Sequence, residues 1–317
     1  MSLVFFDIEC AVVRKTFAKI CAFGYVVCDE KFNIIKKEDI LINPRGEFRL
    51  TDRKGDKGLI LPYEYEEFKK QPAFPKVYHE IKALLEDKDN VVLGHSTMND
   101  VKYLNLETKR FHLPSFNFSF SDSQLIYMTY INDFSHQFGL GHIAEDLGVE
   151  FIPHRAADDA YATMRVVEAM CKAKNCTYAE LIKLLNMTDG KIRNYYITAP
   201  ASGGMRSFKA KQREEKRERG KQRTQFFNYI SRKRIKHGEK FEGKVFTFSR
   251  ELEADLTFSK DLIDGIYAHG GRYSQHITHS NFYVVAEGDD SPRTQSAKNI
   301  DGLKVLSLAE LEGILND

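Results

Sequence analysis

The segment "FFDIEC" places two carboxylates, Asp7 and Glu9, directly behind an apolar run. Alternate residues of a β-strand point to the same face, so the two side chains should project together if this segment is a strand. Carboxylates held side by side repel each other and raise one pKa unless a cation lies between them. Mg²⁺ and Mn²⁺ are bound by such oxygen ligands. A strand end whose acids face water would have the same pattern, so further carboxylates are needed to decide.

Two later segments supply carboxylates in matching contexts. In "VVLGHSTMNDVKYL" a buried strand is predicted to end near His95, and a short turn then delivers Asp100 at the start of a helix. In "IPHRAADDAYATMRV" His154 precedes a predicted helix whose first turn contains Asp158 and Asp159. Acids in a first helical turn can simply be partners of the helix dipole, and this alternative stays open for Asp158. His95 is predicted to be a structural hydrogen-bonding residue.

The elements that must position these residues follow from the spacing of apolar residues through the first 185 positions. Strands are predicted at 3–9, 21–29 and 90–95, with a strand or hairpin arm at 33–44, and helices are predicted at 73–87, 100–104, 120–131, 139–149 and 158–174. The region from Arg45 to Tyr65 is rich in Gly and charge and is predicted to be a loop. Strands first and helices interleaved later indicate an α/β domain with a mixed sheet.

The three acidic segments together resemble the motifs of the DnaQ-like (DEDDh) 3′→5′ exonucleases, the family of the epsilon proofreading subunit of bacterial DNA polymerase III. "FFDIEC" resembles the first motif, "GHSTMNDVKYL" the second and "HRAADDA" the third. "PAFPKVYHEIKALL" and "SDSQLIY" are similar to the family's segments around the second motif. The resemblance covers about residues 2 to 175 and implies a ribonuclease H-like mixed sheet flanked by helices.

The resemblance also implies roles for five residues. Asp7, Glu9, Asp100 and Asp159 would be the metal-binding acids, and His154 the general base. Two Mg²⁺ or Mn²⁺ ions roughly 3.5 to 4 Å apart would bind the scissile phosphate. An imidazole with an ordinary pKa near 6.5 can accept the proton of the attacking water at neutral pH.

A strongly basic segment follows the predicted nuclease. Residues 206–236 contain 13 Lys and Arg against three Glu, whereas the whole chain has a net charge of only +2. Such a tract can neutralise phosphates, so contact with nucleic acid is predicted. The residues proposed for this contact are Arg206, Lys209, Lys211, Arg213, Arg232, Lys233 and Arg234. The aromatic residues among them either stack on unpaired bases or pack against a neighbouring domain, with packing favoured for Phe226 and Phe227.

The block from 241 to 317 resembles a BRCT domain, a small αβ module common in DNA repair proteins. "GKVFTFSRELE" resembles its first strand, "AHGGRYS" contains its glycine pair, and "SNFYVVAEGD" resembles its third strand. In BRCT domains that bind phosphopeptides, a Ser or Thr after the first strand and a Lys on the second helix hold the phosphate. These positions would map to Thr247 and Lys298. Because Phe248 stands where a Gly is expected, docking on DNA ends or on a protein is the alternative.

The chain of 317 residues is therefore predicted to contain an exonuclease domain at 1–190, a basic linker at 191–240 that is either a solvated tether or a helix, and a BRCT-like domain at 241–317. The five cysteines show no zinc-type spacing and are expected to be reduced thiols. No signal peptide or membrane span is recognisable, so a cytoplasmic protein is expected.

The main functional hypothesis is a metal-dependent exonuclease that removes nucleoside monophosphates from the 3′ ends of DNA in replication proofreading or repair. Its partners would be DNA and a replication or repair protein bound through the BRCT-like block. An RNA 3′ exonuclease is the first alternative. A non-catalytic DNA-repair scaffold, in which the nuclease fold only binds nucleic acid, is the second.

Overall fold

The computed structural model describes residues 1–46, 63, 65–150, 155–235 and 240–316. These residues form two compact units, Met1–Lys209 and Ala210–Asp317. His154 and most of the predicted loop between Arg45 and Tyr65 lie outside the described residues. Within the described part of the chain, no helix combines the length and apolar character that a membrane span needs.

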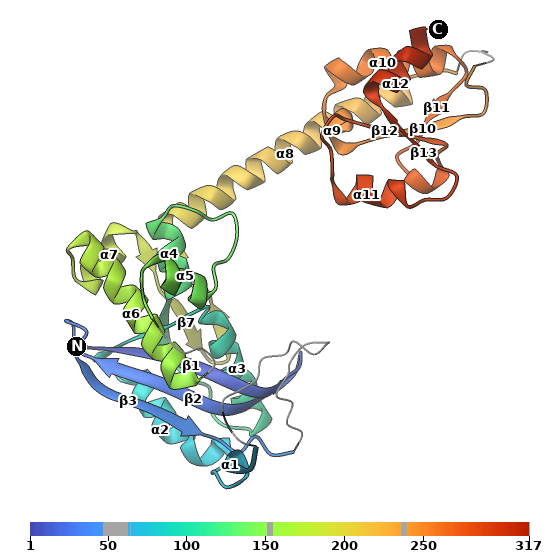
Figure 1. The fold of residues 1–317 in the computed structure, drawn as a ribbon. Helices are drawn as coiled ribbons and strands as arrows, with labels where there is room; N and C mark the ends of the chain where they lie inside the picture. Colours follow the sequence, from blue (N-terminus) through green and yellow to red (C-terminus); the bar gives the residue numbers. More distant parts are fainter. Residues whose placement is uncertain (47–62, 64, 151–154, 236–239, 317) are drawn as a thin grey trace. The chain divides into compact units, whose positions relative to one another are not determined.

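The described residues of the first unit contain a seven-stranded mixed sheet in the order β3-β2-β1-β4-β5-β7-β8 (Figure 1). β1 pairs antiparallel with β2 and parallel with β4, which confirms the predicted sheet type. The strands are β1 (Ser2–Val13), β2 (Ala18–Cys28), β3 (Ile34–Leu41), β4 (Asn90–Gly94), β5 (Phe118–Asp122), β7 (Gly190–Arg193) and β8 (Tyr196–Thr198). A separate pair is formed by β6 (Met187–Thr188) and β9 (Ala201–Ser202).

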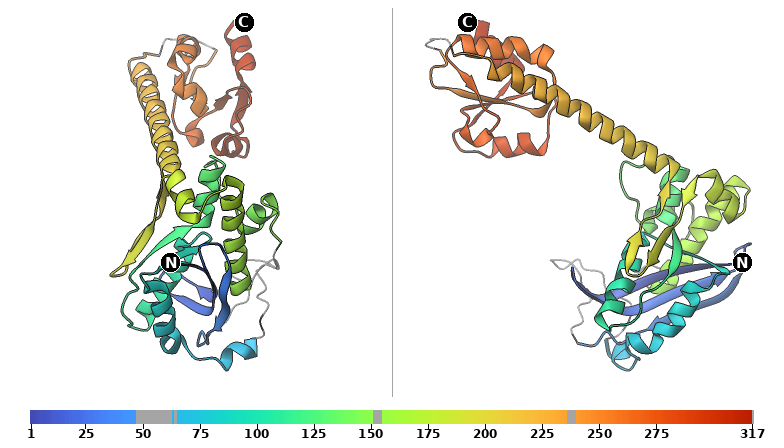
Figure 2. Two further views of the ribbon diagram at one scale, coloured as in Figure 1. Left: turned by 90° about the vertical axis from the view of Figure 1, so that its left-hand side faces the viewer. Right: turned by 180° about the vertical axis from the view of Figure 1, so that it is seen from behind.

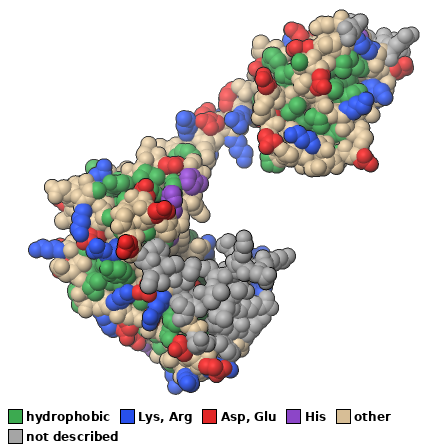
Figure 3. Space-filling model, viewed as in Figure 1, with side chains coloured by type: hydrophobic (Ala, Val, Ile, Leu, Met, Phe, Trp, Pro, Cys, Tyr) green, Lys and Arg blue, Asp and Glu red, His purple; other side chains and the backbone are tan. Residues whose placement is uncertain are grey.

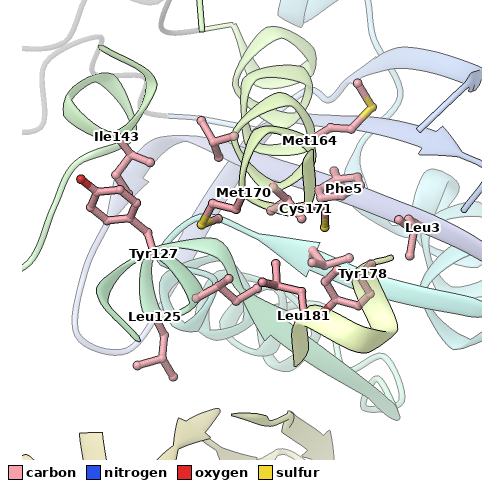
Figure 4. Packing of buried hydrophobic residues seen from close by; sticks show 14 of the residues in the cluster. Leu3, Phe5, Leu125, Tyr127, Ile143, Met164, Met170, Cys171, Tyr178 and Leu181 are labelled. Atoms are coloured by element: carbon pink, nitrogen blue, oxygen red, sulfur yellow. The ribbon is translucent and has the colours of Figure 1, made fainter. Parts of the chain in front are cut away.

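Two hydrophobic clusters lie on opposite faces of this sheet, so β1 is buried on both sides. Leu3 and Phe5 of β1 pack with α4, α5, α6 and α7 (Figure 4), and Phe6 and Ile8 pack with α2 and α3. Figure 2 shows the sheet and these helices from two further sides. The helices are α1 (Tyr65–Lys69), α2 (Phe74–Glu86), α3 (Met98–Arg110), α4 (Ser123–Tyr130), α5 (Leu140–Asp146), α6 (Ala156–Lys174) and α7 (Tyr178–Leu184).

The first unit extends past the boundary that the sequence predicted at residue 190. β7 pairs antiparallel with β5 and with β8, so residues 190–198 belong to the sheet of this unit. The helix α8 (Gly203–Ser231) follows, and the division between the units falls within it. Most of the predicted basic linker is therefore helical.

The described residues of the second unit form a four-stranded parallel sheet in the order β11-β10-β12-β13. Its strands are β10 (Val245–Phe248), β11 (Arg272–Tyr273), β12 (Phe282–Val285) and β13 (Lys304–Ser307). Its helices are α9 (Arg250–Ala254), α10 (Leu256–Ala268), the short η1 (Ile277–His279), α11 (Pro292–Lys298) and α12 (Leu308–Asn316). Phe246, Phe248, Ile263 and Leu311 are among its fully buried core residues. The second unit is thus a small αβ unit, and its resemblance to a BRCT domain stays a prediction.

Candidate active site

The acid pair lies in the middle of β1, an inner strand of the first unit's sheet. Asp7 and Glu9 share a face of β1 with Leu3 and Phe5, the face that α6 covers. Phe5 is fully buried and fixes the strand in the core. The regular pairing of β1 with β2 is interrupted directly after Glu9, where the register shifts between Glu9 and Cys10. The predicted projection of both carboxylates to one side is confirmed.

Asp159 reaches the pair from the first turn of α6. One carboxylate oxygen from each of Asp7, Glu9 and Asp159 can be chosen so that the three atoms lie within 4.8 Å of one another. All three side chains are partly buried. Such a group of oxygen atoms suits a hard divalent cation. The structure thus unites three of the four predicted metal ligands, although they come from sequence positions about 150 residues apart.

Asp100 approaches from the opposite layer, at the start of α3. It is 5% exposed, and its carboxylate is close enough to Asp7 to raise the pKa of that residue. The turn before it is held by two hydrogen bonds: the amide of Ser96 donates to Asp122 over 3.0 Å, and the Thr97 hydroxyl donates to the Ser121 carbonyl over 2.9 Å. Asp100 therefore lies beside the group of three acids, which occupies the middle of β1 just beyond its last pair with β4.

Burial and mutual repulsion both disfavour ionisation of the acids in this group. Burial raises the pKa of Asp7 well above its ordinary value, and the negative charges of Asp100, Glu9 and Asp159 raise it further. Burial also raises the pKa of Asp100, with the charge of Asp122 as the next cause, while backbone amides, including that of Ile8, oppose the rise. Carboxylates that oppose each other's ionisation in this way are stabilised by a bound cation.

Asp122, at the end of β5, is a site residue to which sequence reasoning gave no role. Its carboxylate accepts hydrogen bonds from the amides of Ser96 and Gln124, both at 3.0 Å, so it joins the turn before α3 to the start of α4. Burial raises the pKa of Asp122 to about 6. The signal for this role in the sequence is the position of Asp122 in "SDSQLIY", directly before a predicted helix, where Asp is a favoured N-cap residue.

His95 and Asp158, two other residues of this region, each have a partner of their own. The Nδ1 atom of His95 lies 3.0 Å from the Ser123 hydroxyl, and burial lowers the pKa of His95 to about 4. This arrangement agrees with the structural role predicted for His95. Asp158 forms an ion pair with Lys37 at 2.5 Å, so it has a partner of its own next to the acid cluster.

The aromatic residues of the basic segment pack within their own units. Phe226 is fully buried, with its ring centroid 5.2 Å from that of Tyr273 and 6.1 Å from that of Phe248. The Phe208 ring lies 5.7 Å from that of Phe134 in the first unit. The packing alternative is therefore confirmed for Phe226, which is not accessible for stacking on bases.

The basic residues proposed for nucleic-acid contact differ in the contacts that they make within the protein. Arg206 donates to the Thr188 hydroxyl over 3.2 Å, and Lys233 pairs with Asp264 while lying over the Tyr229 ring. The remaining ones are exposed to solvent: Lys209, Lys211, Arg213, Arg232 and Arg234. Side chains of Lys and Arg project from α8 beside acidic ones (Figure 3).

The two residues proposed for phosphate binding lie in different settings. Thr247 is inside β10 and not after it, is fully buried, and donates its hydroxyl to the Ser274 carbonyl over 2.7 Å. Lys298 is exposed, 3.7 Å from Asp290, and lines a cavity of about 780 Å³. Thr247 does not line this cavity. Ser249, the residue that does follow the strand, is also buried.

Comparison with known families bears on this site. Residues 4–167, more than half of the chain, match the family model RNase_T, described as "Exonuclease". The chain belongs to this exonuclease family. The matched region contains the four acids that the structure brings together, as well as His154. The first unit accordingly has the ribonuclease H-like fold that its sequence predicted. No curated protein sequence matches the chain.

Solved structures give more distant similarities. A 3′-exonuclease described in "3'-end specific recognition of histone mRNA stem-loop" is 12% identical, with a TM-score of 0.48 over 64% of this chain and 91% of that one. The nuclease domain of 3'hExo, a DEDDh family member bound to rAMP, is 15% identical, with a TM-score of 0.44 over 54% of this chain and 92% of that one. Exonuclease I of E. coli with a dT13 oligonucleotide is 16% identical, with a TM-score of 0.44 over 58% of this chain and 43% of that one. At this distance they do not indicate the substrate of this chain.

Proposed function

We propose that this exonuclease is a metal-dependent 3′→5′ exodeoxyribonuclease that releases nucleoside monophosphates from the 3′ ends of DNA. The observation that carries the proposal is the convergence of Asp7, Glu9 and Asp159, with Asp100 beside them, in the middle of β1, just beyond its last residue pair with β4. Because all four acids are present and brought together, a catalytic role is better supported than a scaffold that only binds nucleic acid.

The residues fit two divalent cations, Mg²⁺ or Mn²⁺. Four carboxylates supply the hard oxygen ligands that these ions prefer, and the pKa values of Asp7 and Asp100 are raised by burial and by the negative charges of neighbouring carboxylates. The ions would activate the attacking water and stabilise the leaving 3′-oxygen. The protein's own contribution is to hold the acids at fixed positions, with the buried Phe5 and Phe6 anchoring the strand.

His154 is proposed as the general base that accepts the proton of the attacking water. This role follows from its position five residues before Asp159 in the third motif. The described chain resumes at Arg155, whose Nε donates to Asp39 over 2.7 Å, so the residue next to His154 is attached to the sheet.

The exposed part of α8 is proposed to bind the nucleic-acid backbone with one face. Arg213, Lys216 and Arg217 recur at intervals of three or four residues and therefore share a face of the helix. Glu214 and Glu218 lie on another face by the same spacing. Positive side chains on one face can contact successive phosphates while the acids point away, which supports binding through charge and not through base stacking.

The second unit is proposed to be a BRCT-like docking module that brings the nuclease to a replication or repair protein. Its parallel sheet and helices fit the small αβ module that the sequence resembles. Proofreading or repair is the process in which a DNA 3′ exonuclease with such a module would act.

A substrate panel tests the proposal. Single-stranded DNA, mismatched duplex DNA and single-stranded RNA, each labelled at either the 3′ or the 5′ end, are incubated with the full chain and Mg²⁺ or Mn²⁺. We expect immediate release of labelled mononucleotide from 3′-labelled DNA and a ladder of shortened products from 5′-labelled DNA. Asp100→Ala should lose this activity, whereas Glu38→Gln should keep it because Glu38 pairs with Tyr25 and Lys36.

The other outcomes are equally informative. Preference for RNA would support the alternative of an RNA 3′ exonuclease and overturn the DNA assignment. Cleavage in the middle of the strands, or equal activity of the Asp100→Ala variant, would overturn the exonuclease mechanism. Binding to all three substrates without cleavage under either metal would support the scaffold alternative.

A further inference from the structure

Three neighbouring strands place Asp7, Gly24 and Asp39 in one row across the sheet. Asp7 of β1 is paired with Gly24 of β2, and Gly24 is paired in turn with Asp39 of β3. The row runs from a proposed metal ligand at the centre of the sheet to a carboxylate close to the sheet's edge. The first turn of α6 lies directly over the middle of this row.

Gly24 allows that close approach. A Cβ atom at this position would lie 2.0 Å from the backbone carbon of Ala156 and 2.0 Å from the backbone nitrogen of Ala157. Those neighbours are backbone atoms at the start of α6 and cannot rotate away as a side chain could. Every residue other than glycine would therefore push the start of the helix away from the sheet.

Asp39, at the other end of the row, accepts hydrogen bonds from the same turn of α6. Its Oδ1 accepts the amide of Ala157 over 2.8 Å, and its Oδ2 accepts Nε of Arg155 over 2.7 Å and the hydroxyl of Tyr63 over 3.0 Å. The side chain of Asp39 is only 8% exposed. The residue that precedes α6 makes no capping hydrogen bond with its own side chain, so a carboxylate from a distant strand satisfies an amide of the first turn.

A second contact from β3 supports the same turn. Lys37 lies two residues before Asp39, on the same face of the strand, and its Nζ is 2.5 Å from Asp158. Its ammonium group also lies 4.8 Å from the centre of the Tyr161 ring on α6. Two residues of β3 thus hold the turn that carries Asp159.

We propose that Asp39, together with Gly24, is a positioning residue that sets the place of Asp159 relative to Asp7 and Glu9 and thereby the affinity of the metal site. This inference rests on the proposed function, and it adds a residue that belongs to none of the three motifs. Asp39 acts through the first turn of α6, because its two carboxylate oxygens are occupied by the amide of Ala157, Arg155 and Tyr63. Loss of this carboxylate should make the position of Asp159 relative to Asp7 and Glu9 less well defined, although every metal-binding acid would still be present in the chain.

Direct measurement of Mn²⁺ binding tests the proposal without relying on activity. The full chain is titrated with Mn²⁺, and the free ion is followed by its paramagnetic resonance signal for the wild type, Asp39→Ala and Asp39→Asn. We expect Asp39→Ala to weaken Mn²⁺ binding by about 10- to 100-fold, the range typical of residues that orient metal ligands. Asp39→Asn keeps an oxygen that can accept the Ala157 amide and should recover much of the loss.

Glu38→Ala is the matched control. It removes the neighbouring carboxylate of β3, which is bound to Tyr25 and Lys36, and it should bind Mn²⁺ like the wild type. Thermal unfolding of each variant separates loss of metal affinity from loss of the fold. Gly24→Ala, which keeps every charge but displaces the helix, should weaken Mn²⁺ binding in the same way as Asp39→Ala.

The outcomes separate this inference from the proposed function. Wild-type affinity in folded Asp39→Ala, or equal losses in Asp39→Ala and Glu38→Ala, would overturn the positioning role. A wild-type chain that binds Mn²⁺ but cleaves no nucleic acid would overturn the proposed function, and the role of Asp39 would still be decided by the variants' affinities. A wild-type chain that binds no Mn²⁺ would overturn both.

Discussion

Replacement of Asp7 by asparagine should stabilise the metal-free protein while it abolishes activity. Its carboxylate belongs to a group whose oxygens lie within 4.8 Å, and two unit charges at that distance repel by about 3 kcal/mol at an effective dielectric of about 20. Proton uptake relieves part of this repulsion, because the pKa of Asp7 is raised. We therefore expect a gain of about 1 to 3 kcal/mol, or about 2 to 10 °C in the unfolding temperature of a unit of this size.

The stability of the metal-free protein should fall as the pH rises. A carboxyl group whose pKa is raised by folding contributes stability that is fully present below its unfolded pKa and is lost as the pH rises through the folded pKa. Asp7 and Asp100 have raised pKa values, and that of Asp122 is about 6 against an ordinary 3.8. The metal-free wild type should thus lose stability as the pH rises from about 4 past 6, and Asp7→Asn should lose less.

Thermal unfolding from pH 5 to 8, with EDTA and with Mn²⁺, measures both effects. In EDTA the variant should unfold at a higher temperature than the wild type, and the gap should widen with pH. In Mn²⁺ the wild type should gain stability by binding the ion, and the variant should gain little. Glu38→Gln should show no gain in EDTA, because Lys36 and Tyr25 lower the pKa of Glu38. The reasoning would be refuted if Asp7→Asn were as stable as the wild type, or less stable, throughout this pH range in EDTA.

Two further predictions concern α8 and the second unit. The binding constant for single-stranded DNA should fall with salt concentration, and Arg213→Ser and Lys216→Ser should each reduce the slope of this log–log plot by about 0.7. Glu214→Gln should not reduce the slope. Equal slopes in all variants would exclude this face of α8 as the contact. Phe226→Ala should destabilise the second unit by about 3 to 5 kcal/mol in calorimetry, because Phe226 is fully buried there, and an unchanged unfolding transition would contradict its role in that core.

Much of the site could be predicted because its residues obey local rules. The alternation of β1 fixed the shared face of Asp7 and Glu9, and the apolar spacing that begins after Asp100 and after Asp159 located two helix starts. The predicted strand ended at Glu9, whereas β1 continues to Val13, so the acids lie in the middle of the strand and not at its end. The order of the three motifs then identified the family before any geometry was known.

The residues that hold the site together were not predictable in this way. Asp39 is the last of four consecutive charged residues in "KKEDILI", a composition typical of an exposed segment, and its role depends on a helix more than 110 residues away. Gly24 within a β-strand signals only that some backbone approaches closely. Packing was the favoured prediction for Phe226, but its partners Phe248 and Tyr273 could not be read from the sequence, because they lie at least 22 residues away in the second unit.

The most direct test of the acid cluster is single-turnover release of the 3′-terminal nucleotide from single-stranded DNA in Mn²⁺ by the wild type and Asp159→Ala. The wild type should release the terminal nucleoside monophosphate, and Asp159→Ala should be slower by at least about 10³-fold while it keeps its fold. Equal rates in the two proteins would contradict the assignment of Asp7, Glu9, Asp100 and Asp159 as one catalytic site.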